Sequence, residues 1–343
     1  MVNPQFHRIT RSDVAREAGT SVAVVSYVIN NGPRPVAPAT KQRVLDAIKK
    51  TGYRPNEIAR ALACGTTKTY GLVVPNISNP FISSMAHALQ REAFANGQVL
   101  LLGDAGDSRQ RELELINNLL HRQVDGLLYT SVDRHPYIEL IQATGTPFVM
   151  LDRVDAAQQT CAIRVDERAA AFQATQHLIE HGHREIAIIC GPLDMLNTQD
   201  RVNGWQDALQ QAGLSVRHEW TFSADYTRPG GYQAAQQMLK GPLPQALFAT
   251  NELQALGCLR AMAEHNLTAP RDLALVCFNG TVESEYNVPS LTTVRQPVDA
   301  MAKTAIEMLK NWDGVPTLRE FDFSLQIGES CGCFIPKLID LPL

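Results

Sequence analysis

The chain has 343 residues, of which 45% are hydrophobic and 19% charged, so we expect a globular protein of two or three domains. No stretch approaches the ~18 apolar residues of a membrane span, and the N-terminus lacks an apolar signal segment, which argues against membrane and secreted proteins and favours a cytoplasmic one. The formal charge of −4 is unevenly divided, because residues 1–68 contain 11 Lys and Arg against 4 Asp and Glu. A basic head on an acidic body indicates that the head binds a phosphate backbone.

Residues 12–30, SDVAREAGTSVAVVSYVIN, predict a helix-turn-helix. The first helix fits Ser12–Ala18, and Gly19 can take the left-handed conformation that ends a helix. Ser21 stands where an N-cap of the second helix belongs. That second helix has an apolar stripe formed by Val25, Val28 and Ile29. Two helices this short bury too little to be stable alone, so a third helix is expected to complete the unit.

The third helix is predicted to begin at Pro38, which suits the first turn of a helix, and to end at Thr51 before Gly52. Its inward face should be formed by Val44, Leu45 and Ile48. After Arg54-Pro55 a further short helical segment is expected at 56–64, again too short to be stable in isolation.

From Tyr70 onward, short apolar runs alternate with helix-like stretches. The runs lie at 70–75, 98–103, 125–130, 147–152, 162–165, 185–190, 220–223, 246–250 and 273–278. The helices between them are expected near 80–96, 108–121, 135–144, 167–181, 199–212, 229–240 and 252–266. Continuous apolar strands between helices indicate parallel sheets covered on both faces. Two doubly wound halves therefore follow one another, and such halves bind small ligands beyond the carboxyl ends of their strands.

Several ordered motifs resemble the lactose-repressor/galactose-repressor (LacI/GalR) family of bacterial transcription regulators. The segment SDVAREAGTSVAVVSYVINN is similar to the family's head, and RVLDAIKKTGYRPNEIARAL to its third helix, linker and hinge helix. TKTYGLVVPNISNPF is similar to the start of its effector domain. Further matches are HGHREIAIICGP, RVNGW at 201–205 and PSLTTVRQP at 289–297. The resemblance covers essentially the whole chain.

The resemblance implies an N-terminal all-α helix-turn-helix head with a hinge helix, followed by an α/β core like that of periplasmic binding proteins. We expect the head at 8–55, the hinge helix and linker at 56–68, and the effector-binding core at 69–343. The core should consist of two doubly wound parallel-sheet subdomains joined by three crossings, near Asp166, Arg295 and Gly328. The first subdomain would then span about 69–165 and 296–327, and the second about 166–295 and 328–343.

The resemblance also implies a homodimer bound to pseudo-palindromic double-stranded operator DNA. Val22 and Ala23 would face base edges, where apolar side chains favour thymine methyl groups, unless they only pack on the backbone. Tyr27 replaces a common Arg and Val24 a usual Thr. Leu62 matches the hinge-helix leucine that wedges into the minor groove, the alternative being an ordinary core residue. Further DNA-contact candidates, the first four of them to phosphates, are Ser21, Ser26, Asn30, Tyr53 and Asn56.

For the effector, the resemblance implies a site between the core subdomains, and a sugar, sugar acid or related metabolite as ligand. Arg201 would hold ligand oxygens, a task suited to the guanidinium fork. Phe81 would stack on a ligand ring, with a plain core role as its alternative. The other expected contacts are Asp152, Arg153, Phe222, Asn251, Asn279 and Gln296. Glu252 and Asn279 each replace an Asp of the family pattern.

Enzyme, cofactor and metal functions are not indicated. The histidines at 177, 181 and 183 lack the Glu of an H-E-x-x-H motif, and no P-loop or G-x-S-x-G is present. The seven cysteines have no metal-ligand spacing, and Cys331 and Cys333 are too close for C-x-x-C. The alternative function is a solute-binding protein with the same core fold, against which the basic head and the missing signal segment argue.

Overall fold

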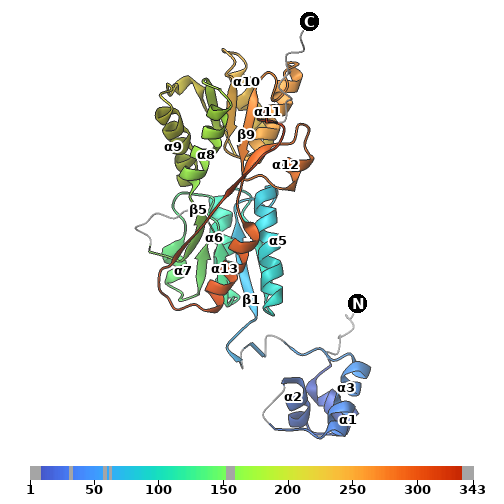
Figure 1. Cartoon of the computed structure of the whole chain (residues 1–343). Helices are drawn as coiled ribbons and strands as arrows, with labels where there is room; N and C mark the ends of the chain where they lie inside the picture. The colour runs from blue at the N-terminus through green and yellow to red at the C-terminus, as the bar shows by residue number, and fades with distance from the viewer. Residues whose placement is uncertain (1–8, 31–33, 57–59, 62–63, 152–158, 334–343) are drawn as a thin grey trace, which may run out of the picture. The chain divides into compact units, whose positions relative to one another are not determined.

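The computed structural model describes residues 9–30, 34–56, 60–61, 64–151 and 159–333 (Figure 1). The chain divides into two compact units, Met1–Thr67 and Lys68–Leu343, called here the head and the core. Among the described residues, no helix is both long and apolar enough to span a membrane.

The head contains three helices, α1 (Arg11–Ala18), α2 (Val22–Asn30) and α3 (Pro38–Thr51). The first starts one residue earlier than expected because Thr10 and Asp13 form a reciprocal capping box. Gly19 ends it with φ of 60°, as predicted for the turn. Ser21 caps the second helix by accepting the Val24 N–H at 3.3 Å. The sequence therefore determines the helix-turn-helix through its caps as well as its apolar spacing.

Tyr53 and apolar side chains from all three helices form the core of the head: Val14, Ala15, Ala18, Val25, Val28, Val44 and Ala47. The prediction for the inward face of α3 was wrong at Leu45, whose side chain is 44% exposed. Ala47 takes the inward position instead, three residues after Val44 and therefore on the same helix face.

The first sheet of the core has the strand order β11-β5-β4-β3-β1-β2 and is parallel throughout. Its strands are β1 (Thr69–Val74), β2 (Val99–Asp104), β3 (Gly126–Tyr129), β4 (Phe148–Met150), β5 (Ala162–Val165) and β11 (Leu318–Phe321). The helices of this subdomain are α5 (Pro80–Ala95), α6 (Arg109–His121), α7 (Ile138–Gln142) and α13 (Val298–Lys310). Clusters of buried apolar side chains lie on both faces, as continuous apolar strands predict.

The second sheet has the order β12-β10-β9-β8-β6-β7, with only the β10–β12 pair antiparallel among the described residues. Its strands are β6 (Ile186–Cys190), β7 (Thr221–Ser223), β8 (Ala246–Ala249), β9 (Ala274–Phe278), β10 (Thr292–Arg295) and β12 (Ser324–Gln326). The helices are α8 (Glu167–Glu180), α9 (Leu196–Gln211), α10 (Arg228–Met238), α11 (Glu252–Glu264) and α12 (Val282–Tyr286), with a short 3₁₀ helix η2 (His218–Trp220). Each sheet forms one subdomain of the core (Figure 1).

The chain crosses between the two subdomains three times. It leaves the first sheet after β5, returns after β10 to form α13, and leaves again between β11 and β12. The third crossing was expected near Gly328, but it lies between Phe321 and Ser324, because β12 pairs with β10 of the second sheet. Phe323 lies in this crossing and packs against the apolar cores of both subdomains.

Close packing of α10 on α11 depends on a glycine. A Cβ atom at Gly257 would lie 2.1 Å from the Arg228 carbonyl oxygen and 2.5 Å from the Tyr232 nitrogen. Both neighbours are backbone atoms, so the two helices would have to separate to admit a side chain.

We therefore predict that Gly257→Ala lowers the free energy of unfolding of the core by about 1–3 kcal/mol, the usual cost of overpacking. Urea unfolding of the full chain measures this change. Gly241→Ala is the control, because its nearest neighbour is the Met238 carbonyl oxygen at 3.8 Å, and its effect should stay within about 0.5 kcal/mol. Equal effects of the two substitutions would show that the close contact does not limit packing.

Candidate functional site

A cavity of about 590 Å³ lies where the carboxyl ends of both sheets meet. In the first subdomain it is lined by residues that directly follow β1, β3 and β4, namely Pro75, Thr130 and Leu151. In the second it is lined by residues near the ends of β6 to β10, namely Pro192, Asp225, Asn251, Asn279 and Gln296. Its size is within the ~300–1,000 Å³ of small-molecule sites, and its position is where doubly wound sheets bind ligands.

A buried ion pair forms part of the cavity lining. Glu167, the first residue of α8, accepts a hydrogen bond from Arg201 Nε of α9, and the two side chains are 7% and 3% exposed. Arg201 Nη1 also donates to the Thr250 carbonyl oxygen at 2.6 Å, and the guanidinium lies 4.0 Å from the ring centroid of Phe278. Arg201 thus connects α8, α9 and the end of β8 while it lines the cavity.

Two aromatic rings, one from each subdomain, line the same cavity. Phe81 is in the first turn of α5, where Asn79 caps the helix by accepting the Phe81 N–H at 3.0 Å. Tyr226 follows β7, and its hydroxyl is 2.7 Å from Thr198 Oγ1. Burial raises the pKa of the Tyr226 phenol, so the group stays protonated and can both donate and accept.

Asn279 occupies a position where backbone geometry favours its residue type. It follows β9 with φ of 60°, in the left-handed region that Asn tolerates better than most residues. Its side-chain oxygen accepts a hydrogen bond of 2.6 Å from Gln296 Nε2, so residues from the ends of β9 and β10 are joined at the edge of the cavity. Both residues line the cavity, as predicted from the sequence.

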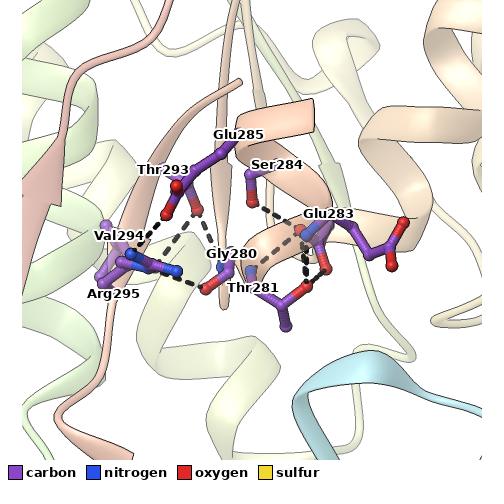
Figure 2. A network of polar contacts seen from close by, with 9 residues as sticks. Gly280, Thr281, Glu283, Ser284, Glu285, Thr293, Val294 and Arg295 are labelled. Atoms are coloured by element: carbon purple, nitrogen blue, oxygen red, sulfur yellow. Dashed lines mark hydrogen bonds and ion pairs between the residues drawn. The ribbon is translucent and has the colours of Figure 1, made fainter. Parts of the chain in front are cut away.

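The loop after Asn279 is fixed by a polar network that includes Gly280, Thr281 and Ser284 (Figure 2). The buried carboxylate of Glu252, which is 2% exposed, is its main acceptor. Glu252 accepts hydrogen bonds from the Thr281 backbone N–H at 2.9 Å, from the Thr281 hydroxyl and from the Ser284 hydroxyl at 2.5 Å. The Gly280 N–H donates to Thr293 Oγ1 at 2.9 Å. The Glu252 carboxylate therefore links the start of α11 to the loop that leads into α12.

The outer side of this network is an ion pair between Arg295 and Glu285, with 2.8 Å between Nη1 and Oε1 (Figure 2). Arg295 ends β10 directly before Gln296, and Glu285 belongs to α12. The pair is partly exposed, so its own contribution to stability is small. Its effect is to keep α12 against the strand that leads to the second crossing.

The cavity has an excess of carboxylates. Among the described residues, five acidic ones line it, Asp107, Asp133, Glu167, Asp194 and Asp225, and two basic ones, Arg164 and Arg201. Both arginines are engaged, Arg201 with Glu167 and Arg164 with Glu320 at 2.9 Å. Within the described part of the chain, the carboxylates of Asp194 and Asp225 make no hydrogen bond or ion pair. The described lining thus presents carboxylate acceptors to hydroxyl or ammonium groups.

Five of the eight predicted effector contacts line this cavity: Phe81, Arg201, Asn251, Asn279 and Gln296. Phe222 is not among the residues that line it, so the contact expected from this residue was wrong. Its side chain packs against the apolar cluster beneath β6 and β8, because residues alternate between the two faces of β7. Asp152 and Arg153 lie outside the described residues.

Sequence reasoning missed other cavity residues, including Tyr226, Asp225 and Asn197. Asp225 and Tyr226 directly follow the strand predicted at 220–223, so the rule that ligands bind beyond the carboxyl ends of strands could have found them. Asn197 is in the first turn of α9, which starts three residues before its predicted beginning at 199.

The head exposes the residues predicted to contact DNA along α2. Val22 is 43% exposed, and Ser21, Ala23 and Asn30 are exposed as well. Ser26 and Tyr27 are partly buried, and Asn30 Nδ2 donates to Ser26 Oγ at 3.2 Å. An apolar start followed by hydroxyl and amide groups is thus presented on one short helix. Exposed basic side chains lie on the same unit, at Arg34, Lys41, Arg43, Lys49 and Lys50.

Two of the predicted DNA contacts, Tyr53 and Asn56, are buried or partly buried. Tyr53 belongs to the apolar core of the head and is only 8% exposed, so its main role is packing. Asn56 is partly buried, and its carbonyl oxygen accepts the Arg60 N–H at 3.1 Å in a helical i to i+4 bond. Leu62 lies outside the described residues.

Comparison with known proteins identifies both units. Residues 10–56 match the family model described as bacterial regulatory proteins, lacI family. Residues 67–312 match that of periplasmic binding proteins and the sugar-binding domain of the LacI family. Catabolite control protein A of Priestia megaterium is 34% identical over 307 residues, which cover 89% of this chain and 92% of that protein.

Solved structures agree with these matches. A lac repressor dimer bound to operator and the anti-inducer ONPF aligns with a TM-score of 0.84 at 26% identity, covering 94% of this chain and 99% of that one. The complex of the transcriptional regulator CelR with cellobiose aligns with a TM-score of 0.71 at 29% identity, covering 94% of this chain and 100% of that one. With a helix-turn-helix head and a ligand cavity in a two-subdomain core, the chain belongs to the LacI family of DNA-binding bacterial transcription regulators.

Proposed function

We propose that this regulator is a repressor that binds a pseudo-palindromic operator as a homodimer and releases or gains it when a neutral sugar enters the cavity of the core. Residues 8–55 would form the DNA-binding head, residues 56–68 the hinge helix and linker between head and core, and residues 69–343 the core that binds the ligand. The observation that carries the proposal is the cavity itself, whose two sides come from subdomains joined by three crossings. The lac repressor dimer on operator supports the assembly by similarity.

The polar lining selects the class of ligand. Arg201 and Arg164 are already paired with carboxylates, whereas Asp194 and Asp225 offer acceptors to the cavity. Hydroxyl groups satisfy such acceptors, and the rings of Phe81 and Tyr226 offer apolar faces to the C–H side of a sugar ring. A sugar acid or phosphate would instead place its charge among carboxylates, at a cost in free energy. The cellobiose complex of CelR supports a neutral sugar by similarity.

The mechanism follows from differential binding. A ligand that contacts both subdomains binds best to the arrangement in which both sets of groups reach it, so it shifts the core toward that arrangement. The crossings after β5, after β10 and between β11 and β12 are the segments that must bend. If the two arrangements differ in operator affinity, the operator must change ligand affinity by the same factor.

We predict that neutral mono- and disaccharides raise the unfolding temperature of the chain in a thermal-shift screen, whereas the matching sugar acids and phosphates do not. Asp225→Asn should weaken binding of the active sugar about tenfold or more, because hydrogen bonds to charged groups contribute ~1.5–3 kcal/mol. Asp299→Asn is the control, since its exposed carboxylate pairs with Arg91 rather than facing the cavity. Preferential binding of a sugar acid would refute the assignment of ligand charge.

Substitution of Arg201 tests the stability of the core as well as its role at the cavity. We predict that Arg201→Met lowers the free energy of unfolding by about 3–5 kcal/mol, because Glu167 is left as an uncompensated buried charge. The double variant Glu167→Gln with Arg201→Met should lose much less than the sum of the single losses. Chemical denaturation of the four proteins completes the cycle, and simple additivity would show that the two side chains do not act as a pair.

For the head, we predict that Tyr27→Arg changes the preferred operator toward guanine at one position in each half-site, because Arg binds guanine O6 and N7 in a bidentate manner. Selection of bound sequences from a randomised pool measures the change. Lys49→Ala should weaken binding to all sequences alike and lower its salt dependence, as expected for a phosphate contact. An unchanged sequence preference with Tyr27→Arg would show that this side chain does not reach the bases.

A further inference from the structure

Two histidines and two cysteines from distant parts of the sequence converge in the second subdomain. Cys333 Sγ lies 3.1 Å from His181 Nε2 and 3.6 Å from His177 Nε2, and 3.4 Å from Cys331 Sγ. The four potential ligand atoms all lie within 4.8 Å of one another. His181 and Cys333 are 152 residues apart, so no spacing motif in the sequence connects them.

The local structure explains why the four groups face each other. His177 is in the last turn of α8 and His181 directly follows this helix, so the i, i+4 spacing places both rings on one face, with centroids 4.7 Å apart. Cys331 is buried in the core of the second subdomain. Gly332, with φ of 94°, takes a conformation that favours glycine and lets Cys333 lie beside Cys331.

The cysteine segment is firmly held by its neighbours. Ser330 Oγ donates to the Leu275 carbonyl at 2.6 Å, and the Leu275 N–H donates to the Ser330 carbonyl at 2.8 Å. Thr292 Oγ1 donates to Cys331 Sγ at 2.9 Å. Hydrogen bonds from neighbouring groups to metal ligands fix the orientation of those ligands and raise metal affinity.

We propose that His177, His181, Cys331 and Cys333 form a tetrahedral binding site for Zn²⁺. Two imidazoles with two thiolates are an established structural donor set for this ion, and thiolates select soft or borderline metals over Mg²⁺ and Ca²⁺. With Zn–S of ~2.3 Å and Zn–N of ~2.0–2.1 Å, a regular tetrahedron requires S to S separations of ~3.8 Å and S to N separations of ~3.6 Å. The three separations that involve Cys333 Sγ, 3.1–3.6 Å, are close to these, and all four ligand atoms lie within 4.8 Å of one another, so side-chain shifts of about an ångström or less would complete the tetrahedron.

The other cysteines provide a contrast. Cys258 and Cys277 are buried in an apolar cluster of the second subdomain, and burial raises the pKa of each thiol to about 12. Cys64 is exposed in the other unit of the chain. A disulfide between Cys331 and Cys333 would account for their proximity, but it would not explain why the imidazoles of His177 and His181 also lie beside Cys333.

A metal ion at this site would link the end of α8 to the segment that follows β12. Because Glu167 begins the same helix, a rigid rod of about 21 Å, at 1.5 Å per residue, connects the metal to the wall of the cavity. Binding to the folded chain alone stabilises it by mass action, so the second subdomain gains stability with Zn²⁺ concentration.

The test uses the untagged full chain, reduced and freed of metal with a chelator under anaerobic conditions. Titration with Co²⁺ should give the intense visible bands of tetrahedral coordination and the near-ultraviolet charge-transfer bands of thiolate ligands, saturating at one ion per chain. Zn²⁺ should then displace Co²⁺ stoichiometrically and raise the unfolding temperature. Weak octahedral spectra, or no binding, would overturn the proposal, as would a Cys331–Cys333 disulfide in the metal-free protein isolated from cells under thiol-blocking conditions.

Single-residue variants locate the ion. Cys333→Ser and His181→Ala change exposed side chains, so both proteins should fold, as circular dichroism will verify, and both should lose at least the ~10–100-fold in affinity that even supporting groups contribute. His183→Ala and Cys64→Ser are the matched controls, because these residues lie outside the cluster, and they should keep full affinity and the Co²⁺ spectrum. Affinity unchanged by Cys333→Ser, or lost equally with Cys64→Ser, would refute the site.

Discussion

The buried ion pair between Arg201 and Glu167 is the interaction on which the ligand cavity depends. Removing two charges from water is costly, and their attraction compensates only when the remaining hydrogen-bonding groups find partners. Arg201 meets this condition through the Thr250 carbonyl and the ring of Phe278. The pair thereby fixes the start of α8, the body of α9 and the end of β8 relative to one another. Arg201, which the family resemblance marks as a ligand contact, therefore also stabilises the packing of these elements.

Two departures from the family pattern lie in one physical unit. Glu252 is longer by a methylene than the Asp it replaces, and its carboxylate accepts hydrogen bonds from Thr281, in the loop after Asn279, and from Ser284 of α12. Asn279 begins that loop in a left-handed conformation and is held by Gln296. The longer carboxylate organises the loop, and the amide occupies the cavity edge as a neutral group. The position of Asn279 at the edge of the cavity therefore depends on the support of its loop as well as on its own side chain.

Much of the architecture could be predicted from local signals. Caps and glycines bound the helices of the head, as Pro38 and Gly52 do for α3, and the alternation of apolar runs with helices predicts two parallel sheets. The third crossing was misplaced because β12 has only three residues, too few for a periodic pattern. Leu45 and Phe222 were assigned to the wrong surroundings because a helix face or strand face is decided by which neighbour packs on it.

Long-range convergence is the other limit of sequence reading. His177 with His181, and Cys331 with Cys333, each carry too little spacing information to indicate a site, and only the path of the chain from β10 through β12 brings the pairs together. The same is true of the cavity charge. Among the described residues, the five carboxylates that line the cavity are spread from residue 107 to residue 225, and only the facing of the two sheets brings them to one space.

The three crossings also determine the order in which the parts can fold during synthesis. The head is contiguous, so all of its core residues emerge early and can pack before the rest is made. Neither core subdomain can pack completely in this way before the C-terminal segments have been made. The first sheet needs α13 and β11, and the second needs β12 and the Ser330 contacts with Leu275. A nascent chain therefore presents a finished DNA-binding head while both core subdomains remain incomplete until residues 318–330 have been made.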